Sequence, residues 1–197
     1  QLTLFDINVK KANVYNLNAK EIRFDYDIFS IIREKTLQSY LTAQTLGGRI
    51  EGNVRLKMDK GRQYLIELKF INLDLDKFVR DFNLDDKIQI SGRLGGRLSL
   101  EGENLVIKLI DGNFIAGQDG GILTIKDKRF LENVAKRSGQ SLDILVESFK
   151  NYRYNKGLMK LSLEKNNIIF DVALDGESGS RNLNIILHDF KLGKEKL

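Results

Sequence analysis

Apolar residues recur at every second position along most of this chain. Residues 87–101 carry isoleucine, leucine or glycine at alternate positions, and most residues between them are polar or glycine. Successive side chains of a strand point to opposite sides, so this period is that of a β-strand with one apolar face. The same period recurs in 50–58, 64–70, 105–109, 168–174 and 183–187. We therefore predict a mainly β fold with one long apolar surface.

Glycine, asparagine and aspartate separate the alternating segments, and the 197-residue chain contains no proline. The candidate turns lie at 59–61, at 111–112, and at Asn166 and Asn167, where residues that tolerate positive φ are expected. Strands joined this closely run antiparallel, because a parallel pair needs a crossover of a dozen or more residues. We predict hairpins at these places and an antiparallel sheet.

Apolar residues at helical spacing predict a few short helices. They cover 75–82 after Asp74, 142–149 after Ser141 or Ser138, and a segment that begins at Asp127 and continues to Ala135. A fourth helix is predicted within 30–45, from the weaker spacing of Leu37, Tyr40 and Leu41.

Glycine pairs recur along the middle of the chain. LGGRI at 46–50 returns as LGGRL at 94–98, and a further pair precedes ILTI at 122–125. A repeat of about fifty residues favours stacked β units. Glycine inside a strand indicates a bend, a bulge or a close backbone approach, so we expect a curved sheet. Neither GGR sequence has the spacing of a phosphate-binding Walker loop.

Residues suited to catalysis are few. His188 is the only histidine, and along a strand the adjacent Asp189 would point to the opposite side. Ser91 and Ser148 lie in no nucleophile elbow, and the absence of cysteine removes thiolate nucleophiles and cysteine metal sites. We predict no enzymatic activity, no metal and no cofactor.

The charges of the chain are mixed rather than clustered. The net charge of +5 comes from 32 basic and 27 acidic residues. The acidic pairs at 25 and 27 and at 74 and 76 are expected as helix caps or solvated groups, because no calcium-binding loop surrounds them. Tyr152, Arg153 and Tyr154 form a single short basic and aromatic cluster, so nucleic-acid binding is not expected.

Membrane and targeting signals are not evident in the sequence. No segment approaches the roughly 20 apolar residues that span a bilayer, and QLTLFDINVKK is not a signal peptide. Because the chain begins with Gln1, we expect it to be part of a longer protein, whose anchor or targeting segment would lie upstream.

Several segments resemble the C-terminal region of AsmA-like bacterial envelope proteins, in particular the YdbH group. They are INLDLDKFVRDFN, then KIQISGRLGGRLSLEG, GGILTI, two helical stretches, and the final segment from NYRYNKGLMKLSLE to ILHDF. The similarity covers roughly 46–190. The terminal domain of this group carries the label dicarboxylate transport domain, which does not by itself identify a substrate.

The resemblance implies a protein that an N-terminal helix anchors in the inner membrane. A long bent sheet would extend through the periplasm, and its hydrophobic inner face would form a groove that carries phospholipid acyl chains between the inner and outer membranes. This chain lacks the anchor and is too short to cross the envelope. We therefore expect residues 1–197 to be a single domain and a C-terminal segment, with the place of 1–45 in the same sheet left open.

The predicted fold is a mainly β, curved antiparallel sheet, an open or taco-like groove with a few short helices packed on it. An acyl chain in such a groove gains about 0.8 kcal/mol for each buried methylene. Lysines or arginines at the rim would meet lipid phosphates. In the alternative interpretation the apolar side chains form an ordinary core against helices 75–82 and 142–149. The predicted groove lining is Ile50, Val54, Leu56, Ile66, Leu68, Ile90, Leu94, Leu98 and Ile107.

Two other functional classes fit the same pattern. A barrel-like or sandwich fold would hold a small ligand in a bounded cavity. A structural or docking module would cap the groove and bind an outer-membrane or periplasmic partner by edge-strand addition. The shape distinguishes the classes: an open groove favours transport, a sealed pocket favours ligand binding, and a filled core with free edges favours assembly.

Overall fold

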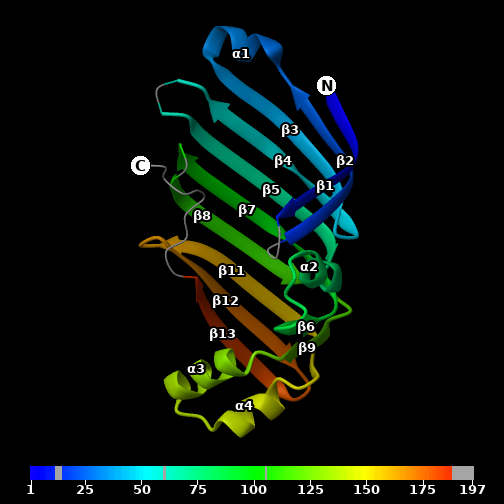
Figure 1. Cartoon of the computed structure of the whole chain (residues 1–197), viewed down its shortest axis with the longest axis vertical. Coiled ribbons are helices and arrows are strands. Elements are labelled where there is room, and N and C mark those ends of the chain that lie inside the picture. Colours follow the sequence, from blue (N-terminus) through cyan, green and yellow to red (C-terminus); the bar gives the residue numbers. More distant parts are fainter. Residues whose placement is uncertain (12–14, 60, 105, 188–197) are drawn as a thin grey trace.

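A ten-stranded antiparallel sheet dominates the computed structural model, which describes residues 1–11, 15–59, 61–104 and 106–187 (Figure 1). Among these residues β1 and β13 are the two edge strands, so the sheet is open and the barrel alternative is not supported. In spatial order the strands are β1 (Leu2–Lys11), β2 (Tyr15–Tyr26), β3 (Thr36–Thr45), β4 (Gly48–Lys57), β5 (Gln63–Asp74), β7 (Arg93–Glu103), β8 (Val106–Ala116), β11 (Lys156–Glu164), β12 (Asn167–Gly176) and β13 (Gly179–Leu187).

A small second sheet and four short helices complete the fold. The small sheet has the order β10 (Tyr152–Tyr154), β9 (Gly121–Ile125) and β6 (Ile88–Ile90). The helices are α1 (Ile28–Glu34), α2 (Leu75–Asp81), α3 (Lys128–Ser138) and α4 (Leu142–Ser148). In Figure 1, α1 lies at one end of the large sheet, while α3 and α4 lie at the other end, beside β13. The predicted mainly β, antiparallel fold with a few short helices is confirmed.

Aspartates begin three of the helices, as their sequence context predicts. The side chain of Asp74 accepts hydrogen bonds from the backbone N–H groups of Asp76 and Lys77 at 3.0 and 3.2 Å. Asp27 and Asp127 accept equivalent bonds at the starts of α1 and α3. These carboxylates satisfy N–H groups that have no partner within the helix. The predicted helices 75–82, 127–135 and 142–149 are confirmed.

The helix predicted within 30–45 is wrong over most of its length. α1 ends before Lys35, whose φ of 51° is left-handed, and Thr36–Thr45 is strand β3. Leu37 and Leu41 fit a helical spacing of four, but they also fit strand alternation. Pairing with β2 and β4 on both sides satisfies the backbone of this segment as a strand. Residues 1–45 thus contribute three strands to the large sheet.

The alternating segment 87–101 is not one strand. Gly92, with a φ of 120°, separates β6 from β7, and these two strands belong to different sheets. A turn at 111–112 is also wrong, because Asp111 and Gly112 lie inside β8. The repeated LGGR sequences occupy different places, since the first forms the turn before β4 and the second lies inside β7.

Two other predicted turns are present. Residues 59–61 connect the paired strands β4 and β5, although residue 60 lies outside the described residues. The turn predicted at Asn166 and Asn167 lies one residue earlier: Lys165 and Asn166 have positive φ and join β11 to β12, whose first residue is Asn167.

Buried side chains concentrate where the two sheets meet. This core lies between the small sheet, α3 and α4 on one side and strands β12 and β13 on the other. Its members are Leu123, Leu131, Leu145, Phe149, Tyr152, Tyr154, Leu174 and Leu183. One end of the large sheet is therefore covered by a second layer.

Candidate functional site

Strand pairing places apolar side chains on one face of the large sheet. Ile66 of β5 lies opposite Val54 of β4 and Leu100 of β7, and Leu68 lies opposite Leu98. Directly opposed residues of neighbouring strands point to the same side of a sheet. We call this side the apolar face. Eight of the predicted lining residues lie on it, and all eight are half-buried: Ile50, Val54, Leu56, Ile66, Leu68, Leu94, Leu98 and Ile107.

Ile90 is the exception among the predicted lining residues. It lies on β6 of the small sheet and packs against the core. The break at Gly92 separates it from Leu94 and Leu98, which the alternation had placed on the same strand.

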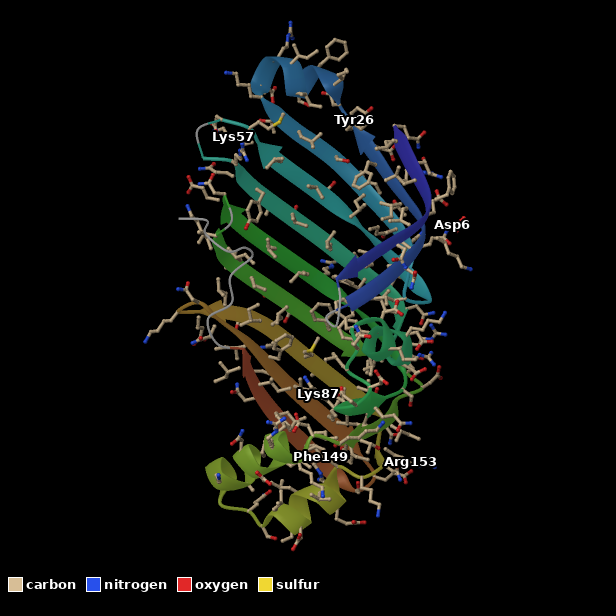
Figure 2. All side chains as sticks on the ribbon, viewed as in Figure 1. Asp6, Tyr26, Lys57, Lys87, Phe149 and Arg153 are labelled. Carbon is tan, nitrogen blue, oxygen red and sulfur yellow. The ribbon has the colours of Figure 1, made fainter. Side chains whose placement is uncertain are left out.

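In the described part of the chain, α3 and α4 do not cover the middle of the apolar face. Among the described residues, the core that α3 and α4 help to form includes Leu174 and Leu183 of β12 and β13, but no residue of β4, β5 or β7. The alternative interpretation places these strands under helices 75–82 and 142–149. Helix 142–149 instead packs at the covered end, whereas helix 75–82 does contact the large sheet, at β5 and β2. Figure 2 shows side chains standing on the central strands between the α1 end and the α3–α4 end.

The opposite face carries charged and polar side chains. Glu51 pairs with Arg49 at 3.0 Å and with Lys69, on the neighbouring strand, at 3.6 Å. Arg97 and Asn113 lie opposite each other on β7 and β8. The sheet therefore has one apolar and one polar face, as the alternation predicts.

Glycines allow a phenylalanine to lie close against the apolar face. A Cβ atom at Gly96 would lie 2.5 Å from Cδ1 of Phe114, and one at Gly112 would lie 2.9 Å from its Cε2. The Phe114 ring also packs against Phe70, with 5.3 Å between the ring centroids. The close approach predicted from glycine inside strands is confirmed here.

The tyrosine and arginine cluster is part of the covered end. Tyr152 and Tyr154 are each only 2% exposed, so their rings are not available to stack on nucleic-acid bases. Tyr152 donates to the carbonyl of Gly179 at 2.6 Å, and Tyr154 donates to that of Ser91 at 2.7 Å. Burial raises the pKa of Tyr154 to about 12. These bonds join the small sheet to its surroundings, a role that no local sequence pattern predicts.

The residues considered for catalysis are not brought together within the described chain. Ser91 Oγ accepts a hydrogen bond from the backbone N–H of Ile122, while Ser148 lies at the end of α4. His188 and Asp189 lie outside the described residues. Over the same described ranges, no group of three or more histidine, aspartate or glutamate side chains is arranged to hold a metal ion.

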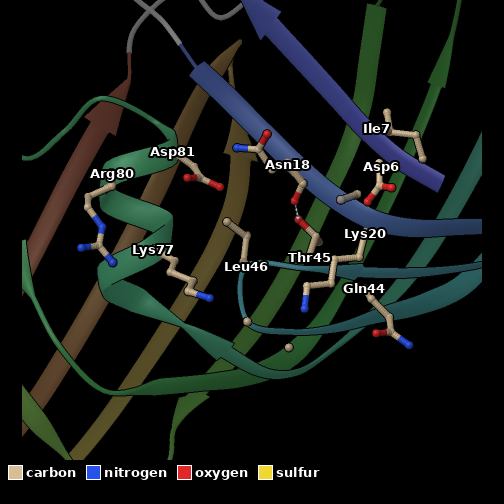
Figure 3. A pocket seen from close by; sticks show the side chains of 13 residues that line it. Asp6, Ile7, Asn18, Lys20, Gln44, Thr45, Leu46, Lys77, Arg80 and Asp81 are labelled. Carbon is tan, nitrogen blue, oxygen red and sulfur yellow. Dashed lines mark hydrogen bonds between the residues drawn. The ribbon is translucent and has the colours of Figure 1, made fainter.

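A charged pocket lies beside the apolar face. It is bounded by α2, the β1–β2 hairpin and the β3–β4 turn, and Figure 3 shows Lys20 and Lys77 on opposite sides of Leu46. α2 follows β5 and also contacts β2, although β3 and β4 lie between β2 and β5 in the sheet, and this arrangement agrees with the predicted curvature. The predicted groove implies cations at its rim, but no local sequence pattern distinguishes Lys20 and Lys77 from other surface lysines.

Among the described residues, no helix has both the length and the apolar character needed to cross a membrane.

Comparison with known proteins identifies the family. No curated protein and no solved structure gives a significant match. The family model described as YdbH-like, intermembrane phospholipid transport protein YdbH, matches residues 3–182. This match includes the ten-stranded sheet almost entirely, and the chain therefore belongs to the YdbH-like family.

Proposed function

We propose that this chain is a non-enzymatic segment of a periplasmic, membrane-anchored phospholipid transport protein, and that its apolar face holds acyl chains. The observation that carries the proposal is the row of eight half-buried apolar side chains on β4, β5, β7 and β8. Membership of a family described by intermembrane phospholipid transport supports the choice of ligand.

The chemistry of the apolar face suits a ligand that moves. Each methylene that leaves water for an apolar surface contributes about 0.8 kcal/mol. Neighbouring strands present similar aliphatic groups, such as Val54, Ile66 and Leu98. A chain that slides from one strand to the next therefore exchanges similar contacts, and no single hydrogen bond has to break.

Adjacent residues of β5 provide a matched test. Ile66 is on the apolar face and Leu65 is on the polar face, and both are half-buried. The purified chain is washed without detergent and extracted with organic solvent, and the lipid is quantified by mass spectrometry. We expect phospholipid on the native chain and on Leu65→Asp, and at least a tenfold loss on Ile66→Asp and on the double variant Ile66→Asp with Leu94→Asp.

Circular dichroism verifies that each variant is folded. Equal lipid on folded Ile66→Asp and Leu65→Asp chains would contradict the proposal. A native chain that carries no phospholipid, and takes none from vesicles, would also contradict it.

A second candidate function is a capping or docking module. The covered end favours it, because α3, α4 and the small sheet bury Leu174 and Leu183 at the end of the apolar face. In this case a partner would add a strand to the edge of β13 or β1. A folded native chain without lipid would favour this candidate over lipid binding.

A further inference from the structure

We propose that the pocket between α2 and the β1–β2 hairpin binds the head group of a zwitterionic phospholipid, by its phosphate and its amine. This inference rests on the proposed function, since the acyl chains of the same lipid would lie on the apolar face. The pocket has a volume of about 640 Å³, and its side chains come from α2, β1, β2, the end of β3 and the turn before β4 (Figure 3).

The floor of the pocket continues the apolar face. Ala19, Thr45 and Leu46 line it and are 5–7% exposed. Ala19 lies opposite both Ile7 of β1 and Thr45 of β3, so these three residues share one side of the sheet. Two residues along β3, Ala43 lies opposite Ile50, the first of the predicted lining residues. A lipid seated on this face can therefore have its head group in the pocket.

Two ammonium groups are available for a phosphate. Lys20 of β2 and Lys77 of α2 line the pocket from opposite sides, as Figure 3 shows. Neither forms an ion pair with a residue in the described part of the chain. Arg80 is already engaged by Asp76, at 2.7 Å. Hydrogen bonds from ammonium groups to phosphate oxygens are stronger than those between neutral groups.

The pocket also carries acidic groups, which determine the kind of head group. Asp6 and Asp81 line it, and within the described ranges neither forms an ion pair. Two carboxylates oppose the binding of a simple anion, but they offer partners to an ammonium group. A head group with one phosphate and one amine satisfies both sets of charges. Phosphatidylethanolamine is therefore the better probe, compared with an anionic lipid.

The experiment compares three lipids with identical acyl chains. Delipidated chain is mixed with vesicles that contain phosphatidylethanolamine, phosphatidylglycerol or diacylglycerol, and uptake is measured by mass spectrometry. The test variant is Lys20→Ala with Lys77→Ala. The control is Lys156→Ala with Lys160→Ala, which removes the same charge from exposed positions on the polar face of β11.

We expect the native chain and the control to take up phosphatidylethanolamine about tenfold better than diacylglycerol. Diacylglycerol has no phosphate or amine, so it cannot form the charged hydrogen bonds that the head group forms in the pocket. The test variant should keep its diacylglycerol uptake and lose this preference. Equal uptake of the two lipids by the native chain would overturn the inference and leave the proposed function intact. Equal uptake of phosphatidylethanolamine and phosphatidylglycerol would overturn the role of the amine.

A second measurement separates the head group from the lipid. Free phosphoethanolamine and inorganic phosphate are titrated while the NMR signals of the lysine side chains are observed. A response at Lys20 and Lys77 to phosphoethanolamine would support the pocket even if no lipid is bound, an outcome that would contradict only the proposed function. A response to inorganic phosphate alone would identify a simple phosphate site and overturn the proposed head group.

Discussion

The hydroxyl of Tyr154 donates a 2.7 Å hydrogen bond to the carbonyl oxygen of Ser91, which precedes it by 63 residues. Ser91 lies between β6 and β7, and Tyr154 ends β10, so the bond connects the small sheet to the start of a central strand of the large sheet. Gly92 lies close by, where a Cβ atom would be 2.8 Å from the Tyr154 hydroxyl. This contact is the basis of the first two predictions.

Replacement of Tyr154 by phenylalanine should destabilise the protein by about 1–2 kcal/mol, because the carbonyl of Ser91 loses its buried donor. Urea denaturation followed by circular dichroism measures the change. Tyr40→Phe is the control, since Tyr40 is 41% exposed on the polar face. Equal midpoints for Tyr154→Phe and the native chain would contradict a structural role for this bond.

Stability should fall as the pH rises from 10 to about 12. Burial raises the pKa of Tyr154 from 10.0 to about 12, so the folded chain retains a proton that the unfolded chain releases in this range. The stabilisation is complete below pH 10 and is lost as the pH passes the folded pKa. Burial also raises the pKa of Tyr152 and Tyr64, and these groups act in the same direction. Denaturation at several pH values should show a smaller slope for Tyr154→Phe, and an unchanged slope would count against this assignment.

Gly96→Ala should destabilise the protein, while Gly95→Ala should not. A Cβ atom at Gly96 would lie 2.5 Å from the carbonyl oxygen of Asn113 and 2.5 Å from the Phe114 ring, and a backbone oxygen cannot move aside. At Gly95 the nearest atom, the carbonyl oxygen of Phe70, is 3.5 Å away. Overpacking of this kind costs about 1–3 kcal/mol. Thermal unfolding of the two variants measures the difference, and similar melting temperatures would exclude the close approach.

Asp74→Ala should reduce stability by about 1 kcal/mol through loss of the helix cap. The Asp74 carboxylate accepts from two N–H groups at the start of α2 and lies 3.7 Å from Arg93. Asp76→Asn is a suitable control, because its ion pair with Arg80 is exposed and worth about 0.5 kcal/mol. Chemical denaturation distinguishes the two, and a larger loss for Asp76→Asn would be inconsistent with capping by Asp74.

The apolar face was predictable because alternation is a local property of the chain. Along β5 the apolar residues Ile66 and Leu68 alternate with the charged residues Glu67 and Lys69. A strand directs alternate side chains to opposite sides, so this pattern places the apolar residues on one face. The helix caps were predictable for a similar reason, since Asp74 acts on N–H groups two and three residues away. The family resemblance depended on the same segments, and the family match confirms it.

Long-range contacts decided what alternation alone could not. Ile90 and Leu94 share one pattern, but Gly92 bends the backbone between them and sends them to different sheets. The spacing of Leu37 and Leu41 fits both a helix and a strand, and the pairing of β3 with β2 and β4 selects the strand. In each case the local sequence permits two conformations, and partners distant in sequence determine which has the lower free energy.

Alternation along the chain is enough to predict a sheet with one apolar and one polar side, because side-chain direction follows from the backbone period. Which part of the apolar side is covered depends on the packing of elements that are distant in sequence. α3 and α4 pack over Leu174 and Leu183, while the central strands keep half-buried side chains. Such packing also brings Lys20 and Lys77 to one pocket from β2 and α2, which no local pattern encodes. Burial and charge clustering depend on how separate elements pack, and that packing is set by the whole chain.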